Sequence, residues 1–474
     1  MWYNPIMNVA EGIRKRLRAE TVLLITAVIG STLYISLAFN DNLWVDEAFT
    51  ASLIRGNINN VIHDTVSDTL PPFYNIAGKL LTLIFGFSPV VLKLFSCLPM
   101  VLLLFFGGRK LYSIFGFRPA FLYELFLFSM PHFLHYGVEI RMYSWGVFAC
   151  GMAAIDFTDI LKNRASLKGF MLFSVFAGYI HHFALVSCGM MWFLLLVTAI
   201  YSNDRKMLEE FFKNLGLFIL LYLPGLLLSS YQIKNAGSWF SMAPLTPGSF
   251  FSDLRFPFVT NVTVLSALLL FYLCFTAFVL IFKTDGKSHP YGLLLLSVPY
   301  QTLLFGYGVS FISGKSLFTA RYLVPSLAVF WLGAAILSDL AIAAFNDNRY
   351  ISGVLAALIA ATLVICYFQA FREEYDPGVT YMKAFFDENL GGDDACIMSE
   401  DKPELQICFR YYYPGLKKTN WKNAGETKGT LWLFVNGENG KALENADKYG
   451  YNPKYTGDFA FDRYSFSLYK LEKP

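Results

Sequence analysis

Long stretches of apolar residues recur along this chain and constrain its fold more than any other feature. A helix needs roughly 20 apolar residues to cross a bilayer, and eleven stretches approach or reach that length: about 21–39, 89–107, 119–135, 142–160, 168–181, 183–201, 214–230, 262–282, 290–309, 322–344 and 350–368. With 55% hydrophobic and 15% charged residues, the chain is too apolar for a soluble globule. We therefore expect a polytopic α-helical membrane protein of about eleven spans, whose short fifth span is broken or bent where it meets the sixth.

Lysine and arginine fall on alternate connections between the predicted spans. They cluster before the first span and recur in the other connections of that side: Arg14, Lys15, Arg16 and Arg18, then Arg109, Lys110, Arg118, Lys162, Arg164, Lys168, Arg205, Lys206, Lys213, Lys283, Lys287 and Arg349. Because positive residues favour the cytoplasmic side, we expect a multi-pass plasma-membrane protein with a cytoplasmic N-terminus and an outer C-terminus. The net charge of +3 is too small to suggest a nucleic-acid partner.

The composition changes near Phe371, beyond which the chain is polar. Short apolar runs and helical patterns alternate there: strands are predicted at Ala395–Met398, Thr430–Val435 and Tyr464–Tyr469, and helices at Val379–Leu390 and Lys441–Tyr449. We therefore expect residues 1–370 to form a transmembrane domain, with a first outer loop at about 40–88, and residues 371–474 to form a small extracytoplasmic α/β domain. Cys396 and Cys408 of that domain could form a disulfide or remain thiols.

Acidic residues stand out in the first outer loop. Asp46 and Glu47, in the sequence W-V-D-E-A-F-T, could be an ordinary acidic flank of a membrane helix. They could equally deprotonate a hydroxyl, or hold a cation, beside a lipid-borne substrate. Asp68 precedes two prolines that stiffen the segment S-D-T-L-P-P-F-Y, and the same prolines are consistent with the capped start of a helix at about 73–86.

Three further clusters combine basic, aromatic and acidic side chains at span ends. They are E-I-R-M-Y with Glu139, Arg141 and Tyr143, I-H-H-F with His181 and His182, and G-K-S-L-F-T-A-R-Y-L with Lys315, Arg321 and Tyr322. The planar donor fork of arginine suits a phosphate. Taken singly, each cluster is also consistent with headgroup anchoring, snorkelling side chains or polar packing at a helix break.

All five clusters fall on one side of the membrane in the expected topology. The outer span ends carry Asp46, Asp68, Arg141, His181 and Arg321. A transporter typically has polar residues or broken helices near the midplane, in matching halves. The one-sided pattern instead favours an outward-facing reaction site at the membrane surface.

In this order the motifs resemble those of the GT-C glycosyltransferases. The elements W-V-D-E-A, D-x-x-P-P-x-Y, E-x-R-M-Y, x-H-x-F-A-L and a late R-Y-L are similar to the protein-mannosyltransferase-like branch, which is related to protein O-mannosyltransferase and lipid A aminoarabinose transferase. The resemblance implies an inverting enzyme that moves a sugar from a polyprenyl-phosphate donor to an extracytoplasmic glycan, lipid or protein. It implies no nucleotide cofactor, and the chain contains no glycine-rich nucleotide-binding motif.

The resemblance also implies residue roles. Asp46 corresponds to the general base and Glu47 to its companion, while Asp68 matches a family segment in which Leu70 replaces a common histidine. The residues implied to bind the donor and its phosphate are Glu139, Arg141, Tyr143, His181, His182, Lys315, Arg321 and Tyr322. Whether Asp46, Glu47 and His181 hold a divalent metal ion stays an open question, because the change at position 70 removes one expected ligand.

Two functions of other classes remain alternatives. A flippase or transporter of a lipid-linked sugar would move its substrate without making or breaking a glycosidic bond. An assembly partner without enzyme activity, whose outer domain binds polysaccharide, would keep its function in an Asp46→Asn variant.

Overall fold

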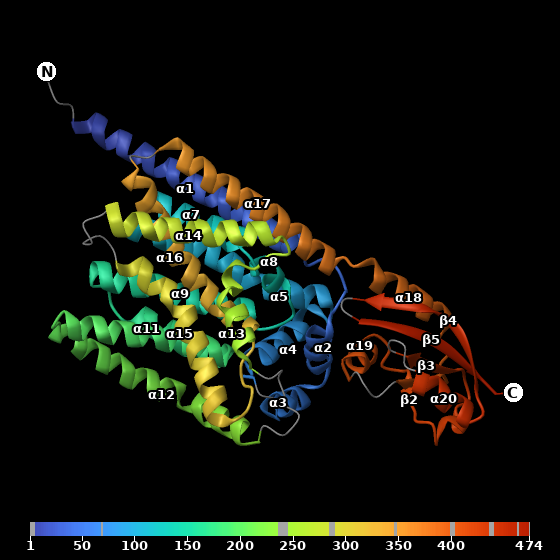
Figure 1. Cartoon of the computed structure of the whole chain (residues 1–474). Helices are drawn as coiled ribbons and strands as arrows, with labels where there is room; N and C mark the ends of the chain where they lie inside the picture. Colours follow the sequence, from blue (N-terminus) through green and yellow to red (C-terminus); the bar gives the residue numbers. More distant parts are fainter. Residues whose placement is uncertain are drawn as a thin grey trace. The chain divides into compact units, whose positions relative to one another are not determined.

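Figure 1 shows the computed structural model, which describes residues 5–67, 70–235, 245–283, 290–345, 348–398, 403–435, 440–461 and 464–473. The chain divides into two compact units. The first comprises Met1–Phe39, Asn57–Gly86 and Val91–Ala370, and the second comprises Asn40–Gly56, Phe87–Val90 and Phe371–Pro474. The segment that carries Asp46 and Glu47 therefore groups with the C-terminal domain and not with Asn57–Gly86 of the first outer loop.

Helices make up the first unit. In chain order they are α1 (Pro5–Ser36), α3 (Ile58–Ser67), α4 (Phe73–Phe85), α5 (Pro89–Leu102), the π-helix η1 (Leu103–Gly107), α6 (Gly108–Phe115), α7 (Phe117–Ser129), α8 (Phe133–Val138), α9 (Tyr143–Asn163), α10 (Lys168–Ile180), α11 (His182–Tyr201), α12 (Arg205–Asn235), α13 (Pro247–Leu254), η2 (Phe256–Phe258), α14 (Thr263–Lys283), α15 (Pro290–Ser313), η3 (Ala320–Leu323), α16 (Val324–Ala344) and α17 (Arg349–Glu374). Within the described ranges, nine helical segments are long and apolar enough to span a membrane. The predicted polytopic fold is confirmed.

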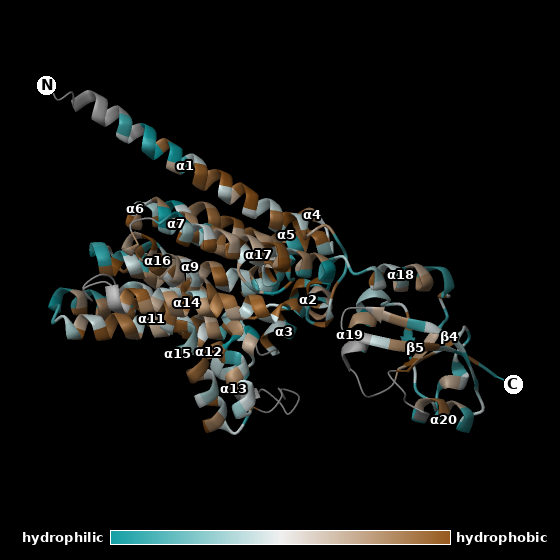
Figure 2. Ribbon diagram, turned by 45° about the horizontal axis from the view of Figure 1, so that its top comes forward, coloured by the Kyte–Doolittle hydropathy of each residue, from teal (hydrophilic) through white to brown (hydrophobic). Residues whose placement is uncertain are grey.

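Burial separates a helical core from a lipid-facing exterior in this unit. Helix α16 is buried along most of its length and packs against α7, α9 and α15. Helix α12, by contrast, exposes large apolar side chains such as Leu220 and Leu227. The hydropathy colours of Figure 2 show predominantly hydrophobic ribbon along many of these helices. Exposed apolar side chains on a long apolar helix are what a hydrocarbon solvent favours.

The predicted span 119–135 is wrong as a single helix. Helix α7 ends at Ser129 and the short helix α8 begins at Phe133. Pro131 accounts for the break, because it disfavours helical backbone at the residue before it. Met130 is accordingly extended (φ −81°, ψ 158°), and His132 adopts a left-handed backbone with φ 73°.

The expected bend between the fifth and sixth spans is present. Helix α10 has 13 residues, too few for a full span, and it packs against α11. His181 is the single residue between them, with extended backbone (φ −157°, ψ 133°). Its carbonyl and side chain both accept from α11 backbone amides, so the chain reverses at a residue that also caps the following helix.

The second unit contains a five-stranded sheet flanked by helices. Its strands are β1 (Ala395–Met398), β2 (Lys417–Lys418), β3 (Leu431–Val435), β4 (Asn452–Phe461) and β5 (Tyr464–Glu472), and its helices are α2 (Val45–Arg55), α18 (Pro377–Asn389), α19 (Pro403–Tyr412), η4 (Ala424–Glu426) and α20 (Gly440–Lys448). The strand order is β2-β1-β3-β5-β4, with β1 parallel to β2 and β3, and β5 antiparallel to β3 and β4. The α/β character expected for this domain is confirmed.

The sheet is covered on both faces, as the continuous apolar runs of β1 and β3 require. Ile397 and Leu433 pack on one face with Ala446 of α20. On the other face, Phe386 of α18 and Phe434 of β3 have stacked rings 5.8 Å apart. Cys396 and Cys408 are buried free thiols, so the disulfide considered from sequence is absent.

Candidate functional site

The acidic motif forms the first turn of helix α2. Glu47 is 3% exposed, and its carboxylate accepts a hydrogen bond from the Trp44 backbone amide at 3.3 Å. Glu47 thus caps the helix that carries it. Asp46 is only partly buried and lies in the same first turn, where the positive end of the helix dipole favours negative charge. Of the two carboxylates, Asp46 is the more exposed.

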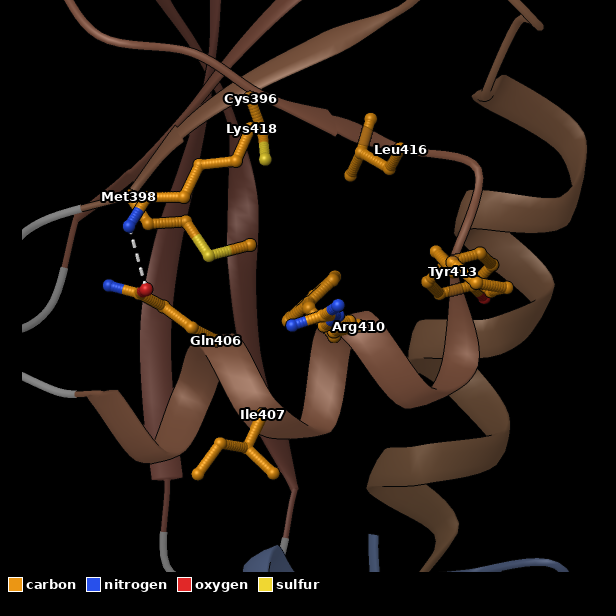
Figure 3. A pocket seen from close by; sticks show the side chains of 10 residues that line it. Cys396, Met398, Gln406, Ile407, Arg410, Tyr413, Leu416 and Lys418 are labelled. Atoms are coloured by element: carbon orange, nitrogen blue, oxygen red, sulfur yellow. Dashed lines mark hydrogen bonds between the residues drawn. The ribbon is translucent and has the colours of Figure 1, made fainter. Parts of the chain in front are cut away.

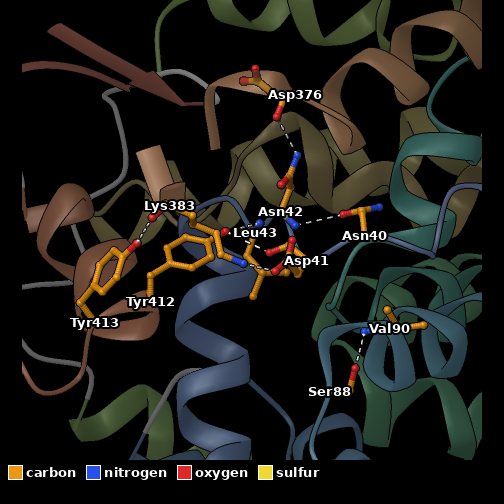
Figure 4. Close-up of polar contacts among 10 residues, drawn as sticks. All are labelled: Asn40, Asp41, Asn42, Leu43, Ser88, Val90, Asp376, Lys383, Tyr412 and Tyr413. Carbon is orange, nitrogen blue, oxygen red and sulfur yellow. Dashed lines mark hydrogen bonds and ion pairs between the residues drawn. The ribbon is translucent and has the colours of Figure 1, made fainter. Parts of the chain in front are cut away.

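Helix α2 and the residues before it are held by the C-terminal domain (Figure 4). The Leu43 amide donates to the Tyr412 hydroxyl at 2.8 Å, and the Asn42 side chain donates to the Asp376 carbonyl at 3.1 Å. At the other end of α2, the Arg55 guanidinium donates to the Tyr411 carbonyl at 3.1 Å. It also lies 4.6 Å from the centre of the Tyr411 ring, a cation–π distance. The position of Asp46 is therefore set by backbone and side-chain groups more than 300 residues further along the chain.

We expect a Tyr412→Phe variant to loosen this attachment. The Tyr412 hydroxyl accepts from Leu43 and donates to the Asp41 carbonyl at 3.2 Å, and phenylalanine can do neither. Losing the hydrogen bond between Leu43 and Tyr412 costs about 1 kcal/mol, so hydrogen exchange of the buried Leu43 amide should become about fivefold faster. Hydrogen–deuterium exchange of the peptide containing Leu43 measures this, with Tyr455→Phe on the exposed part of β4 as control. Unchanged protection would show that the hydroxyl does not hold the segment.

In the first unit, four elements bring six predicted donor-site residues together. This His181 cluster consists of Glu139, Arg141, Tyr143, His181, Arg321 and Tyr322, from the α8–α9 connection, the start of α9, the α10–α11 turn and η3. The His181 ring lies 5.6 Å from the Tyr143 ring and 5.1 Å from the Tyr322 ring. Both arginines act electrostatically on the His181 imidazole and on the Tyr143 hydroxyl. Glu139 and Arg141 lie before the start of α9 at Tyr143, in its connection to α8.

The tautomer of His181 follows from its hydrogen bonds. Nδ1 accepts from the Phe183 amide at 3.1 Å, so the proton of the neutral ring is on Nε2. His181 lies between two helices, outside both. Burial lowers its pKa well below the usual value, and the charges of His182, Arg141 and Arg321 lower that pKa further. Nε2–H is therefore a neutral donor, buried and without a hydrogen-bond partner among the described residues.

Together these groups present donors to an anion. Two half-buried guanidiniums, the His181 Nε2–H and the buried Tyr143 hydroxyl belong to one cluster. Arginine pairs with phosphate in a forked geometry that a single ammonium cannot reproduce. Glu139, 2% exposed, contributes the negative charge in this group. The arrangement is suited to a phosphate oxygen more than to a neutral substrate atom.

Other predicted residues lie at the margin of the cluster or elsewhere. His182 begins α11 and is half-buried, and its ring acts electrostatically on His181. Lys315 is exposed in the connection between α15 and η3. Asp68 lies outside the described residues. Within the described ranges, no three histidine, cysteine, aspartate or glutamate side chains form a group that could hold a metal ion.

Sequence reasoning missed an aromatic extension of the His181 cluster. The Tyr136 ring lies 5.1 Å from the Tyr143 ring. Nearby in the chain, His132 stacks on the Phe256 ring at 4.0 Å, and its Nε2 lies 2.8 Å from the Phe256 carbonyl oxygen. The sequence feature that could have indicated this extension is Pro131. A proline inside an apolar stretch predicts a break in the helix, and His132 and Tyr136 follow that break.

Neither a family model nor a curated protein sequence matches this chain. Solved structures do. ArnT from Cupriavidus metallidurans in the apo state matches with a TM-score of 0.61 and 11% identity, covering 94% of this chain and 97% of ArnT. The same protein bound to undecaprenyl phosphate gives a TM-score of 0.59 at 10% identity, with 95% and 97% covered. An Archaeoglobus fulgidus oligosaccharyltransferase, in complex with zinc and sulfate, gives 0.53 at 15% identity, with 95% and 75% covered.

At these identities the likeness concerns the fold. The chain has the fold of the GT-C membrane glycosyltransferases, over nearly its whole length. The resemblance that the motifs suggested, which included lipid A aminoarabinose transferase, is confirmed at that level.

Proposed function

We propose that this protein is an inverting glycosyltransferase that moves a sugar from a polyprenyl-phosphate donor to an extracytoplasmic glycan, lipid or protein. The observation that carries the proposal is the His181 cluster, an anion-suited group of buried and half-buried donors in a helical membrane unit. The ArnT structure of the same fold binds undecaprenyl phosphate, which supports a polyprenyl-phosphate donor here. We further propose a cytoplasmic N-terminus and an extracytoplasmic C-terminal domain, because positive residues fall on the N-terminal side.

In the proposed reaction, the donor phosphate is held by Arg141 and Arg321. Breaking the sugar–phosphate bond leaves negative charge on the lipid phosphate, and fixed donors around it lower the barrier. His181 donates Nε2–H to a phosphate oxygen and stays neutral, so it adds no third positive charge beside the arginines. Tyr143 supplies a further hydroxyl donor from the start of α9.

Asp46 is the proposed general base. It takes the proton of the acceptor hydroxyl as the oxygen attacks the anomeric carbon, and a single displacement inverts that carbon. Glu47 has a positioning role in this proposal, because its carboxylate caps α2. Asp68 stays a second candidate for the base.

Metal dependence stays a prediction from sequence. The steps proposed for Asp46 and for the His181 cluster use protein side chains alone. Exhaustive chelation of the purified enzyme separates the alternatives, because a required divalent ion would make transfer stop and recover when the ion is returned.

We expect deletion of residues 372–474 to separate donor binding from transfer. The His181 cluster belongs to the first unit, so affinity for undecaprenyl phosphate should stay within about twofold. Transfer should fall by about 10², because the deletion removes Tyr411 and Tyr412, which hold α2. Equilibrium binding and a transfer assay on the same preparation measure both. Unchanged transfer by a well-folded truncated protein would assign the outer domain another role.

The proposed function is tested in cells by removing the gene. Mass spectrometry of surface glycans should then show the loss of one sugar, and that sugar identifies donor and acceptor together. Restoring the wild-type gene should restore the sugar, and the Asp46→Asn gene should not. A surface glycan profile that is unchanged on deletion would overturn the proposal.

A further inference from the structure

The C-terminal domain contains a pocket remote in sequence from every motif discussed above. Its volume is about 520 Å³, and it lies between α19 and the β1–β2 edge of the sheet (Figure 3). Pockets that bind small molecules have volumes of about 300–1,000 Å³. The space is sufficient for one or two sugar rings.

The pocket occupies the part of the sheet where open α/β folds bind ligands. Strands β1 and β2 are parallel, and Cys396 pairs with Lys418 in the register. Lys418 and Met398, the last residues of β2 and β1, both line the pocket. In parallel sheets, the carboxyl ends of adjacent strands form the usual binding crevice.

The polar groups of the lining are mainly donors. The Lys418 ammonium donates to the Gln406 side-chain Oε1 at 2.7 Å, which leaves the Gln406 side-chain NH₂ and the other ammonium protons for a ligand (Figure 3). Arg410 adds a guanidinium from α19. The Cys396 thiol stays protonated, because burial raises its pKa to about 12. The described lining contains no carboxylate, so its charge is positive.

The remaining lining is apolar and aromatic. Met398, Ile407 and Leu416 contribute aliphatic surface, and Tyr413 contributes a ring. The Tyr413 hydroxyl donates to the Lys383 carbonyl at 3.3 Å, so its polar end is occupied outside the pocket lining. Sites for small organic molecules combine such surface with a few fixed polar groups. A bare inorganic anion would use the donors and leave this surface unused.

We propose that this pocket binds an anionic sugar, a monosaccharide unit that carries a phosphate or a carboxylate. The anionic group lies against Arg410 and Lys418, and the sugar ring packs on Tyr413 and the aliphatic side chains. That the sugar belongs to the acceptor glycan rests on the proposed function. The pocket then holds the acceptor on the same compact unit that carries Asp46.

Calorimetric titration of the purified full-length protein tests this with four probes: glucose 6-phosphate, glucuronate, glucose and inorganic phosphate. We expect at least one anionic sugar to bind with a millimolar Kd, and glucose and phosphate each to bind at least about fivefold more weakly. The double variant Arg410→Ala/Lys418→Ala should weaken that binding by about tenfold or more. Lys417→Ala, the exposed neighbour in β2 that does not line the pocket, should leave it unchanged.

Three results would overturn the proposal. They are no binding of either anionic sugar, binding of inorganic phosphate that is as tight as that of the sugars and is lost in the double variant, and unchanged sugar binding in the double variant. The titration involves no glycosyl transfer, so its outcome is independent of the proposed reaction. If the protein binds an anionic sugar but transfers no sugar, the pocket proposal stands and the proposed function is refuted.

Discussion

Replacing Asp46 with asparagine is expected to lower turnover by about 10² or more while the protein still folds. Asparagine keeps the shape of the side chain but cannot accept the proton of the attacking hydroxyl. Asp46 is only partly buried, and Glu47 makes the capping contact, so the substitution leaves α2 intact. Donor binding should be unchanged, because the His181 cluster is untouched. The measurement is the single-turnover rate of sugar transfer with saturating donor.

A matched control is Asp64→Asn, an exposed carboxylate on α3 that pairs with His63. It removes one negative charge from the same outer loop and should leave turnover within about twofold. If Asp46→Asn turns over like the wild type, Asp46 is not the base. Asp68 then becomes the next residue to test, because Glu47 is committed to the helix cap.

Removing the two guanidiniums of the His181 cluster is expected to have the second largest effect. Arg141→Ala and Arg321→Ala should each lower kcat/KM for the lipid donor by about 10² to 10³, the usual cost of losing a donor to developing charge. Lysine at either position should restore only part of the activity, because an ammonium lacks the forked geometry. Part of the loss should appear as weaker binding of undecaprenyl phosphate, measured on the same preparations.

Lys168→Ala is the control for these variants. Lys168 is exposed at the start of α10, at the opposite end of that helix from His181. The substitution removes a cation from α10 and leaves the His181 cluster unchanged, so kcat/KM for the lipid donor should stay within about twofold of the wild-type value. Equal losses of kcat/KM in the Lys168 and Arg321 variants would mean that the loss comes from the change in net charge and not from a phosphate site at Arg321.

The sequence predicted the membrane fold well because apolar length is a local property. Nine of the eleven predicted stretches correspond to helices long enough to span. The stretch 119–135 failed because hydropathy ignores the backbone restriction that Pro131 imposes on Met130. In the C-terminal domain, β1 was located to the residue, whereas β4 was missed. An exposed strand with a register shift at Gly457 carries little apolar signal.

The candidate site was only partly predictable from the sequence, because part of it depends on contacts between residues far apart in the chain. Motifs at span ends located Arg141, His181 and Arg321, which the fold brings together. The attachment of α2 to Tyr411 and Tyr412 could not be inferred, since it joins residues more than 300 positions apart. The tautomer of His181 depends on its turn geometry, and no sequence pattern encodes that. Contacts of this kind arise from tertiary packing.

The most direct test of the proposed function is sugar transfer by the purified protein in sealed liposomes. The wild type and Asp46→Asn would each receive a radiolabelled polyprenyl-phosphate sugar, or a labelled nucleotide sugar, with an envelope fraction as acceptor. The proposed function predicts that label moves from the lipid to the acceptor in the wild type and stays on the lipid in the variant. Transfer from the nucleotide sugar alone, or passage of the labelled lipid across the membrane with no new glycosidic bond, would contradict it.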